Sequence, residues 1–166
     1  MFLSGCGYTT KSMFSEEFKT VYVDNFKNMI KISAEQTNLR MYRGYRPGME
    51  VNMRNVVIDK FLIDGNLKLD SEDKADLVLK VNFHDYKREA IGWNATDDIE
   101  EYRIKLVVDM EMVDMKKGKV LWTEKGFTGE QDYRTTGALA MSEGAALVLA
   151  EKDLARRIVE RTVEAW

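Results

Sequence analysis

Glu100–Phe127 has the sequence EEYRIKLVVDMEMVDMKKGKVLWTEKGF and predicts two long strands joined by a tight turn. In the first strand every second residue is apolar, and these residues are Tyr102, Ile104, Leu106, Val108, Met110 and Met112. Side chains alternate across a strand, so one face is apolar and the other is mostly charged. Gly118 lies in the turn, where a positive φ is expected. The stretch therefore predicts an antiparallel hairpin with one buried and one solvated face.

The segments on either side of the hairpin predict two helices and two further strands. Apolar residues recur at three- and four-residue spacings in Met49–Gly65 and Ser142–Trp166, which is the pattern of amphipathic helices. The further strands are expected at Val21–Phe26 and Ala75–Arg88, and loops or long connections at Lys27–Gly48, Glu89–Ile99 and Thr128–Ala140. The Lys27–Gly48 connection could include an irregular strand, and the Leu67–Asp73 link a short one at Leu67-Lys68-Leu69. Because a helix separates the first two strands, they should be parallel neighbours. The sequence thus predicts a two-layer α/β fold, a four-stranded mixed sheet in β-α-β-β-β-α order with two helices packed on one face.

Composition restricts the class of protein. The chain has 166 residues, of which 45% are hydrophobic and 32% charged, enough for one domain with a true core. Its net charge of −3 argues against a nucleic-acid-binding protein, which is usually strongly basic. With Cys6 as the only cysteine, an internal disulfide and a thiolate-rich zinc site are excluded. No run of apolar residues approaches the length of a membrane-spanning helix.

The sequence contains no constellation typical of an enzyme. His84 is the only histidine, and on a strand it points away from its neighbour Asp85, so we interpret it as a structural or surface residue. The acidic residues Asp97, Asp98, Glu100 and Glu101 match no metal-binding spacing, and a solvated acidic turn is the simpler interpretation. No glycine cluster forms a phosphate cradle. We expect a non-enzymatic protein without a metal or cofactor.

The N-terminus contains Leu3-Ser4-Gly5-Cys6, which resembles a bacterial lipobox. In a lipobox a small residue precedes the cleaved bond, here Gly5, and the thiol of the next residue, here Cys6, carries the lipid. A signal peptide also needs a basic segment and an apolar segment of about 7–15 residues, so we expect such a leader to be encoded before Leu3. The alternative is a cytoplasmic domain with a lone terminal cysteine. We expect an anchor at 1–8, a flexible tether at 9–20 and one domain at 21–166.

Several short segments, in this order and spacing, together resemble the lipopolysaccharide-assembly lipoprotein family, LptE. They are Cys6-Gly7-Tyr8, Arg46-Pro47-Gly48-Met49-Glu50, Phe61-Leu62-Ile63-Asp64-Gly65, Ala75-Asp76-Leu77-Val78-Leu79, Glu101-Tyr102-Arg103-Ile104, Gly118-Lys119-Val120-Leu121-Trp122 and Leu154-Ala155-Arg156-Arg157-Ile158-Val159. The resemblance implies a periplasmic domain anchored to the outer membrane through acylated Cys6, a location with which Gly7 is compatible. It also implies that the protein plugs the β-barrel LptD, assists its assembly and binds lipopolysaccharide. The alternative is a periplasmic lipoprotein of similar fold that activates a cell-wall synthase or acts as a secretion pilot.

Lipopolysaccharide carries phosphates and acyl chains, so binding requires lysine or arginine beside apolar side chains. One candidate contact is the hairpin tip, with Lys116, Lys117 and Lys119. The other is the end of the preceding strand, with Lys87 and Arg88 close to Ile91 and Trp93. These two ends of the sheet are too far apart for one site, and each could be an ordinary charged turn. A basic, aromatic segment, with Arg40, Tyr42, Arg43, Tyr45 and Arg46, is interpreted either as a contact for an anionic partner or as solvated side chains.

Overall fold

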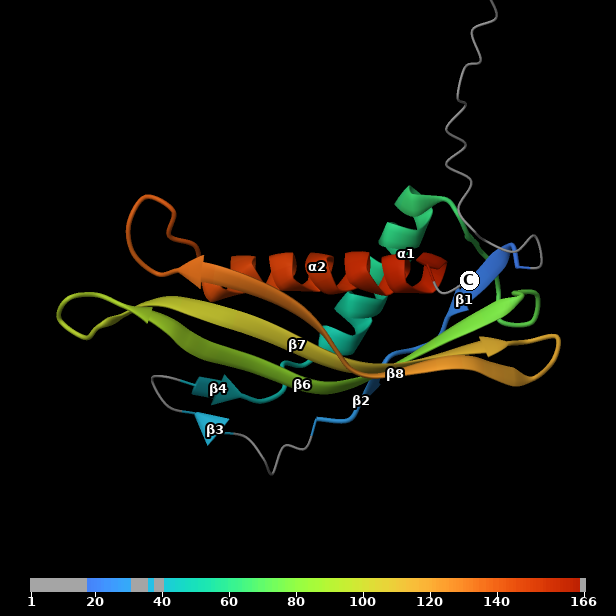
Figure 1. The fold of residues 1–166 in the computed structure, drawn as a ribbon, viewed down its shortest axis with the longest axis horizontal. Coiled ribbons are helices and arrows are strands. Elements are labelled where there is room, and N and C mark those ends of the chain that lie inside the picture. The colour runs from blue at the N-terminus through green and yellow to red at the C-terminus, as the bar shows by residue number, and fades with distance from the viewer. Residues whose placement is uncertain (1–17, 31–35, 38–40, 165–166) are drawn as a thin grey trace, which may run out of the picture.

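The computed structural model describes residues 18–30, 36–37 and 41–164. In chain order the elements are β1 (Thr20–Val23), β2 (Lys27–Asn28), β3 (Gln36–Thr37), β4 (Met41–Arg43), α1 (Met49–Asp64), β5 (Lys68–Leu69), β6 (Leu77–Trp93), β7 (Ile99–Asp114), β8 (Lys119–Arg134) and α2 (Glu143–Glu164). Figure 1 shows three long strands, β6 to β8, lying beneath the two helices. The predicted α/β fold with two helices and a mixed sheet is confirmed.

The predicted number and order of strands are wrong. The described residues form one eight-stranded sheet, and the order along the chain is β-β-β-β-α-β-β-β-β-α. The additional strands, β2 to β5, are only two or three residues long. A strand this short has no alternating pattern that a sequence could display. Three of the four lie in the Lys27–Gly48 segment, for which the sequence predicts a long connection with at most one irregular strand. The fourth, β5, lies at the short strand indicated by Leu67-Lys68-Leu69.

Strand β6 organises the sheet. One of its edges pairs with β7 along its whole length, from Leu77↔Asp114 to Trp93↔Ile99. Along its other edge lie three strands in succession, β1 and β2 in parallel and β4 antiparallel. Since α1 lies between β1 and β6 in the chain, the predicted parallel crossover is confirmed.

The hairpin is confirmed and is longer than predicted. Pairing between β7 and β8 runs from Glu101↔Arg134 to Asp114↔Lys119, and Gly118 has a φ of 61°. Strand β6 continues to Trp93 and β8 to Arg134, so the loops predicted at Glu89–Ile99 and Thr128–Ala140 begin later than expected. The strands continue into these polar segments because their backbones remain hydrogen-bonded to the neighbouring strand, and backbone pairing does not require alternating apolar residues.

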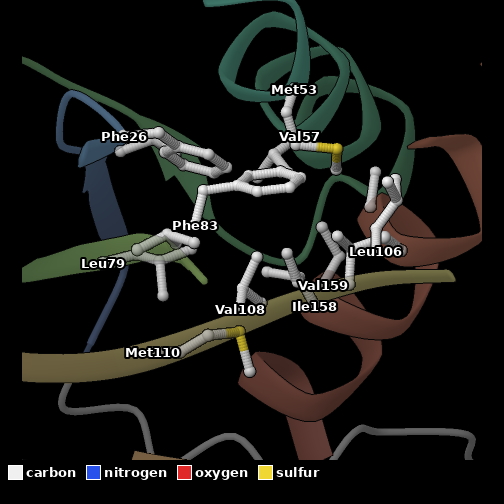
Figure 2. Packing of buried hydrophobic residues seen from close by; sticks show 14 of the residues in the cluster. Phe26, Met53, Val57, Leu79, Phe83, Leu106, Val108, Met110, Ile158 and Val159 are labelled. Atoms are coloured by element: carbon white, nitrogen blue, oxygen red, sulfur yellow. The ribbon is translucent and has the colours of Figure 1, made fainter. Parts of the chain in front are cut away.

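Both helices lie on the apolar side of the sheet, where α2 runs along β7 and β8 and α1 packs against α2, β1 and β5. The predicted apolar row is buried from Ile104 to Met112, each side chain at most 1% exposed. Figure 2 shows Phe83, Leu106 and Val108 of the sheet packed against Met53 and Val57 of α1 and Ile158 and Val159 of α2. The predicted stripe of α1 is buried at Met53, Val57 and Phe61, but Leu62 is 65% exposed. Gly65 ends α1 as predicted, with a φ of 74° and its N–H donated to the carbonyl of Phe61.

Candidate functional site

The β7–β8 tip is held from beneath by two carboxylates, the buried Asp114 and the half-buried Asp76. Asp114 accepts the backbone N–H groups of Lys116 at 2.8 Å and Lys117 at 3.0 Å, which fixes the turn. Asp76 receives the Lys116 ammonium group at 2.6 Å and the backbone N–H of Lys19 at 2.8 Å. The Lys116 ammonium group, together with the N–H of Lys19, lowers the pKa of Asp76 to about 2.

The lysine side chains of this tip point outward. Those of Lys116 and Lys117 are 67% and 60% exposed, whereas their carboxylate partners are 13% and 1% exposed. Lys119 is also exposed, at the start of β8. Each ammonium group carries three donors and lies at the surface, where an anion can approach it. The structure therefore brings Lys116, Lys117 and Lys119 together on one exposed turn.

The second predicted pair, Lys87 and Arg88, does not lie at a strand end. A β-bulge between Phe83 and Asp85 shifts the pairing of β6, so that Tyr86 lies opposite Leu106 and Arg88 opposite Ile104. Residues opposite each other share a face, so Tyr86 and Arg88 lie on the helix side of the sheet. Lys87 lies opposite Lys105 on the other side, with its ammonium group 3.5 Å from Asp85. The two residues thus belong to different surfaces.

Arg88 belongs to a group of polar side chains around Glu143, the first residue of α2, which we call the Glu143 cluster (Arg46, Tyr86, Arg88 and Glu143). The carboxylate of Glu143 accepts hydrogen bonds from the Tyr86 hydroxyl at 2.7 Å and from Arg88 at 2.8 Å, and it is also paired with Arg46. Burial raises the pKa of Glu143, but the Tyr86 and Arg88 hydrogen bonds and the charge of Arg46 outweigh this effect and lower it. Glu143 therefore joins the start of α2 to β6 and to the segment before α1.

Aromatic rings surround the Glu143 cluster. The Arg46 guanidinium lies 5.2 Å from the ring centroid of Tyr86, and that of Arg88 lies 4.9 Å from the centroid of Tyr102. Tyr42 of β4 meets Tyr86 edge-on at 5.6 Å. Within the predicted basic, aromatic segment, Tyr42 and Arg46 therefore pack against the domain, and Tyr45 donates a hydrogen bond to Glu50. Arg40 lies outside the described residues, as does the side chain of Arg43.

The sheet face opposite the helices, the open face, carries charged residues of β7 and their neighbours. Its β7 residues are Arg103, Lys105, Val107, Asp109 and Glu111. Arg103 makes a two-point contact with Asp132, at 2.6 and 2.8 Å, and lowers the pKa of that carboxyl group. Lys105 pairs with Glu130 at 2.9 Å, and Glu111 with Lys80 at 3.4 Å. The open face is therefore a charge-balanced surface of ion pairs between neighbouring strands.

A model of the family LptE, described as lipopolysaccharide-assembly, matches residues 18–162. The chain belongs to this family. The LptE match covers the β7–β8 tip, the Glu143 cluster and the open face. No curated protein sequence matches the chain.

Three solved structures share the fold of this LptE chain. A minor lipoprotein from Acinetobacter baumannii is 15% identical with a TM-score of 0.54, and the match covers 88% of this chain and 93% of that one. The protein CT253 from Chlamydia trachomatis is 11% identical with a TM-score of 0.55, over 88% of this chain and 96% of that one. The protein XCC0632 from Xanthomonas campestris is 12% identical with a TM-score of 0.53, over 89% and 85%. At such identities the likeness concerns the fold alone.

The remaining residues considered from the sequence have local roles in the LptE domain. His84 lies on the open face, 2.9 Å from Asp109. In the β6–β7 loop, Asn94 accepts the N–H groups of Thr96 and Asp98, each at 2.9 Å. Within residues 18–30, 36–37 and 41–164, no three metal-ligating side chains gather and no helix is long and apolar enough to cross a membrane. The anchor predicted at Cys6 lies outside the described residues.

Proposed function

We propose that this chain is a non-enzymatic outer-membrane lipoprotein, anchored through acylated Cys6, that plugs an LptD-type β-barrel and assists its assembly. It binds lipopolysaccharide while the lipid is inserted into the outer leaflet. The observation that carries the proposal is the LptE match, which runs through both helices and all three long strands. The proposed activity is binding, so it requires surfaces of suitable charge and shape rather than a catalytic centre.

The open face is the surface that we assign to the barrel wall. Strands β6, β7 and β8 have 17, 16 and 16 residues, so at about 3.3 Å per residue each is roughly 50 Å long. The interior of a large outer-membrane barrel is polar and wet. A long, charge-balanced face fits such an interior, because its ion pairs can be exchanged for contacts with polar side chains of the wall at little cost.

The β7–β8 tip is the contact that we assign to lipid phosphates or to an acidic part of the barrel. Its three lysines are exposed, and Asp76 and Asp114 hold the turn in place beneath them. A turn that is already ordered loses little conformational entropy when it binds. Lysine ammonium groups bind phosphate as compact charges from several directions.

Isolation of the partner tests the proposal. The full chain, with a C-terminal tag, should recover one large β-barrel from detergent-solubilised outer membranes. Replacement of Cys6 by serine should release the chain from the membrane fraction. Recovery of a cell-wall synthase or a secretion channel instead of a barrel would overturn the proposal in favour of the alternative lipoprotein function.

A charge reversal at the tip tests the assigned contact. We expect Lys117→Glu to fold normally and to bind the barrel or lipopolysaccharide more weakly, because it places a carboxylate where an anion should bind. Lys119→Glu is a second test that leaves the Lys117–Asp114 pair intact. Lys125→Glu, at an exposed position of β8 outside the tip, is the matched control. Unchanged binding in both tip variants would make the tip an ordinary solvated turn.

A further inference from the structure

A groove of about 410 Å³ lies between α1 and α2, on the side of the sheet away from the open face. It is lined by Val56, Asp59, Lys60, Ile63, Lys152, Ala155 and Arg156. Figure 1 shows α1 crossing α2 in this layer. The volume is within the range of small-molecule sites in proteins, about 300–1,000 Å³. None of the functional candidates named from the sequence lies in it.

The floor and one rim of the groove are apolar. Val56 is half-buried and Ala155 is buried, while Ile63 is 78% exposed at the end of α1. On α2, Val148 lies one turn before Lys152 and is 48% exposed, so it continues the apolar surface beyond the groove. Single exposed apolar residues are common on a protein surface, but a run of them that continues into a groove is typical of a binding site.

The cations of the groove differ in their pairing. Arg156 is neutralised by Asp153 at 2.7 Å and by Glu160 at 2.6 Å. Lys60 and Lys152, one on each helix, have no carboxylate within 4.0 Å among the residues that the structure describes. Asp59 is the one carboxylate in the lining. The groove therefore offers an apolar floor beneath two unneutralised ammonium groups on opposite sides.

We propose that this groove holds an acyl chain of lipopolysaccharide, and that Lys60 and Lys152 contact phosphates of its lipid A headgroup. The inference rests on the proposed function and adds a lipid contact on the helix side of the protein, so that the β7–β8 tip is left to the acidic part of the barrel or to a further phosphate. An acyl chain matches the apolar floor, and an anionic headgroup matches the two lysines. Cations on two separate helices suit a headgroup with two phosphates better than a single fatty acid carboxylate.

Equilibrium binding of fluorescent lipopolysaccharide to the full chain tests this site. We expect Lys60→Glu/Lys152→Glu to bind at least about tenfold more weakly, because two attractive contacts become repulsive. Val56→Glu should have a similar effect, because it places a charge on the floor. The controls are Lys68→Glu/Lys125→Glu, an equal charge change on exposed strand residues, and Leu62→Glu, an exposed apolar residue of α1 outside the lining. Both controls should bind within about twofold of the wild type.

Each outcome separates this inference from the function on which it rests. If the wild type binds lipopolysaccharide and the groove variants bind equally well, the groove assignment is overturned while lipid binding stands. If the wild type does not bind lipopolysaccharide, the lipid part of the proposed function fails as well. If phosphatidylglycerol vesicles compete better than lipopolysaccharide for the same residues, the occupant is a phospholipid and the assignment is wrong. Thermal unfolding of each variant identifies any loss of folding. We expect Lys60→Glu/Lys152→Glu to unfold at the same temperature as the wild type, because both side chains lie at the surface of the groove.

Discussion

Gly129 provides the sharpest test of how α2 is packed on the sheet. It lies in β8, opposite Leu106, directly beneath α2. A Cβ atom at this position would lie 2.6 Å from both the backbone nitrogen and the Cα of Leu154. Carbon atoms attract each other best at about 3.5–4.0 Å, so Gly129→Ala requires α2 and β8 to separate by roughly 1 Å. The obstacle is helix backbone, so no side-chain rotation can relieve it.

The separation would strain two further contacts. Asp153 accepts the backbone N–H of Glu130 at 3.1 Å, and Arg157 donates to the carbonyl of Thr128. Overpacking in a core typically costs about 1–3 kcal/mol, and two strained hydrogen bonds add to it. We therefore expect Gly129→Ala to lower the free energy of unfolding by about 3 kcal/mol. For a domain of this size, the melting temperature should fall by about 6–12 °C.

Urea and thermal unfolding followed by circular dichroism measure this effect. Gly144→Ala is the matched control, because Gly144 lies in α2 and the nearest atom to an added Cβ, Ser142 Oγ, is 4.0 Å away. Alanine is the better helix former, so the control should be unchanged or slightly more stable, by up to about 1 kcal/mol. If Gly129→Ala is as stable as the wild type, α2 does not rest on β8 as described.

Two further predictions concern the half-buried carboxylates of Glu143 and Asp76. Glu143→Gln leaves Arg46 and Arg88 without a counter-charge and should lower the free energy of unfolding, measured with urea, by about 2 kcal/mol. Tyr86→Phe removes one neutral donor and should lower it by about 1 kcal/mol. Equal stability of Glu143→Gln and the wild type would contradict a role for this charge. The pKa of Asp76 is lowered from 3.8 to about 2 in the folded protein, so its contribution to stability is complete above about pH 4 and is lost as the pH falls towards 2. The wild type should therefore lose more stability than Asp76→Asn between pH 4 and pH 2. If the free energy of unfolding falls equally with pH in the two proteins, the Lys116–Asp76 pair does not contribute to acid sensitivity.

The parts of the fold that could be predicted are those with a repeated pattern. Alternation from Tyr102 to Met112 is long enough to determine the strand, its buried face and its partner. The helix stripes at Met53, Val57 and Phe61 and at Ala150, Leu154 and Ile158 were recognisable for the same reason. Both patterns extend over several turns or pleats, so one unusual residue does not obscure them. Of the short strands, β5 lies at the Leu67-Lys68-Leu69 strand that the sequence indicates, whereas β2 to β4 offer two or three residues each and could not be placed individually.

Strand β6 continues to Trp93, so Lys87 and Arg88 do not lie at its end, and the β-bulge decides which of the two faces the helices. On the helix side of β6 the buried residues recur at every second position from Leu77 to Phe83, and the next large buried side chain is Tyr86, three residues after Phe83. A change from even to odd spacing within one strand is the trace of an inserted residue. This trace was visible in the sequence, and it predicts that Lys87 turns to the open face while Arg88 turns towards the helices. The partner of Arg88, Glu143, lies 55 residues away, and no local pattern relates the two.

The barrel contact of the open face and the lipid contact of the helix groove can be tested separately, because the sheet lies between them. The open face and the helix groove lie on opposite sides of one sheet, and the groove lysines share no ion-pair partner with Arg103 or Lys105. Mutations at separate sites without shared partners usually have independent effects. Lys60→Glu/Lys152→Glu should therefore still recover the barrel while binding lipid weakly. If that variant also loses the barrel, lipid and barrel contact the same side of the protein, and the open face is not the surface that meets the barrel wall.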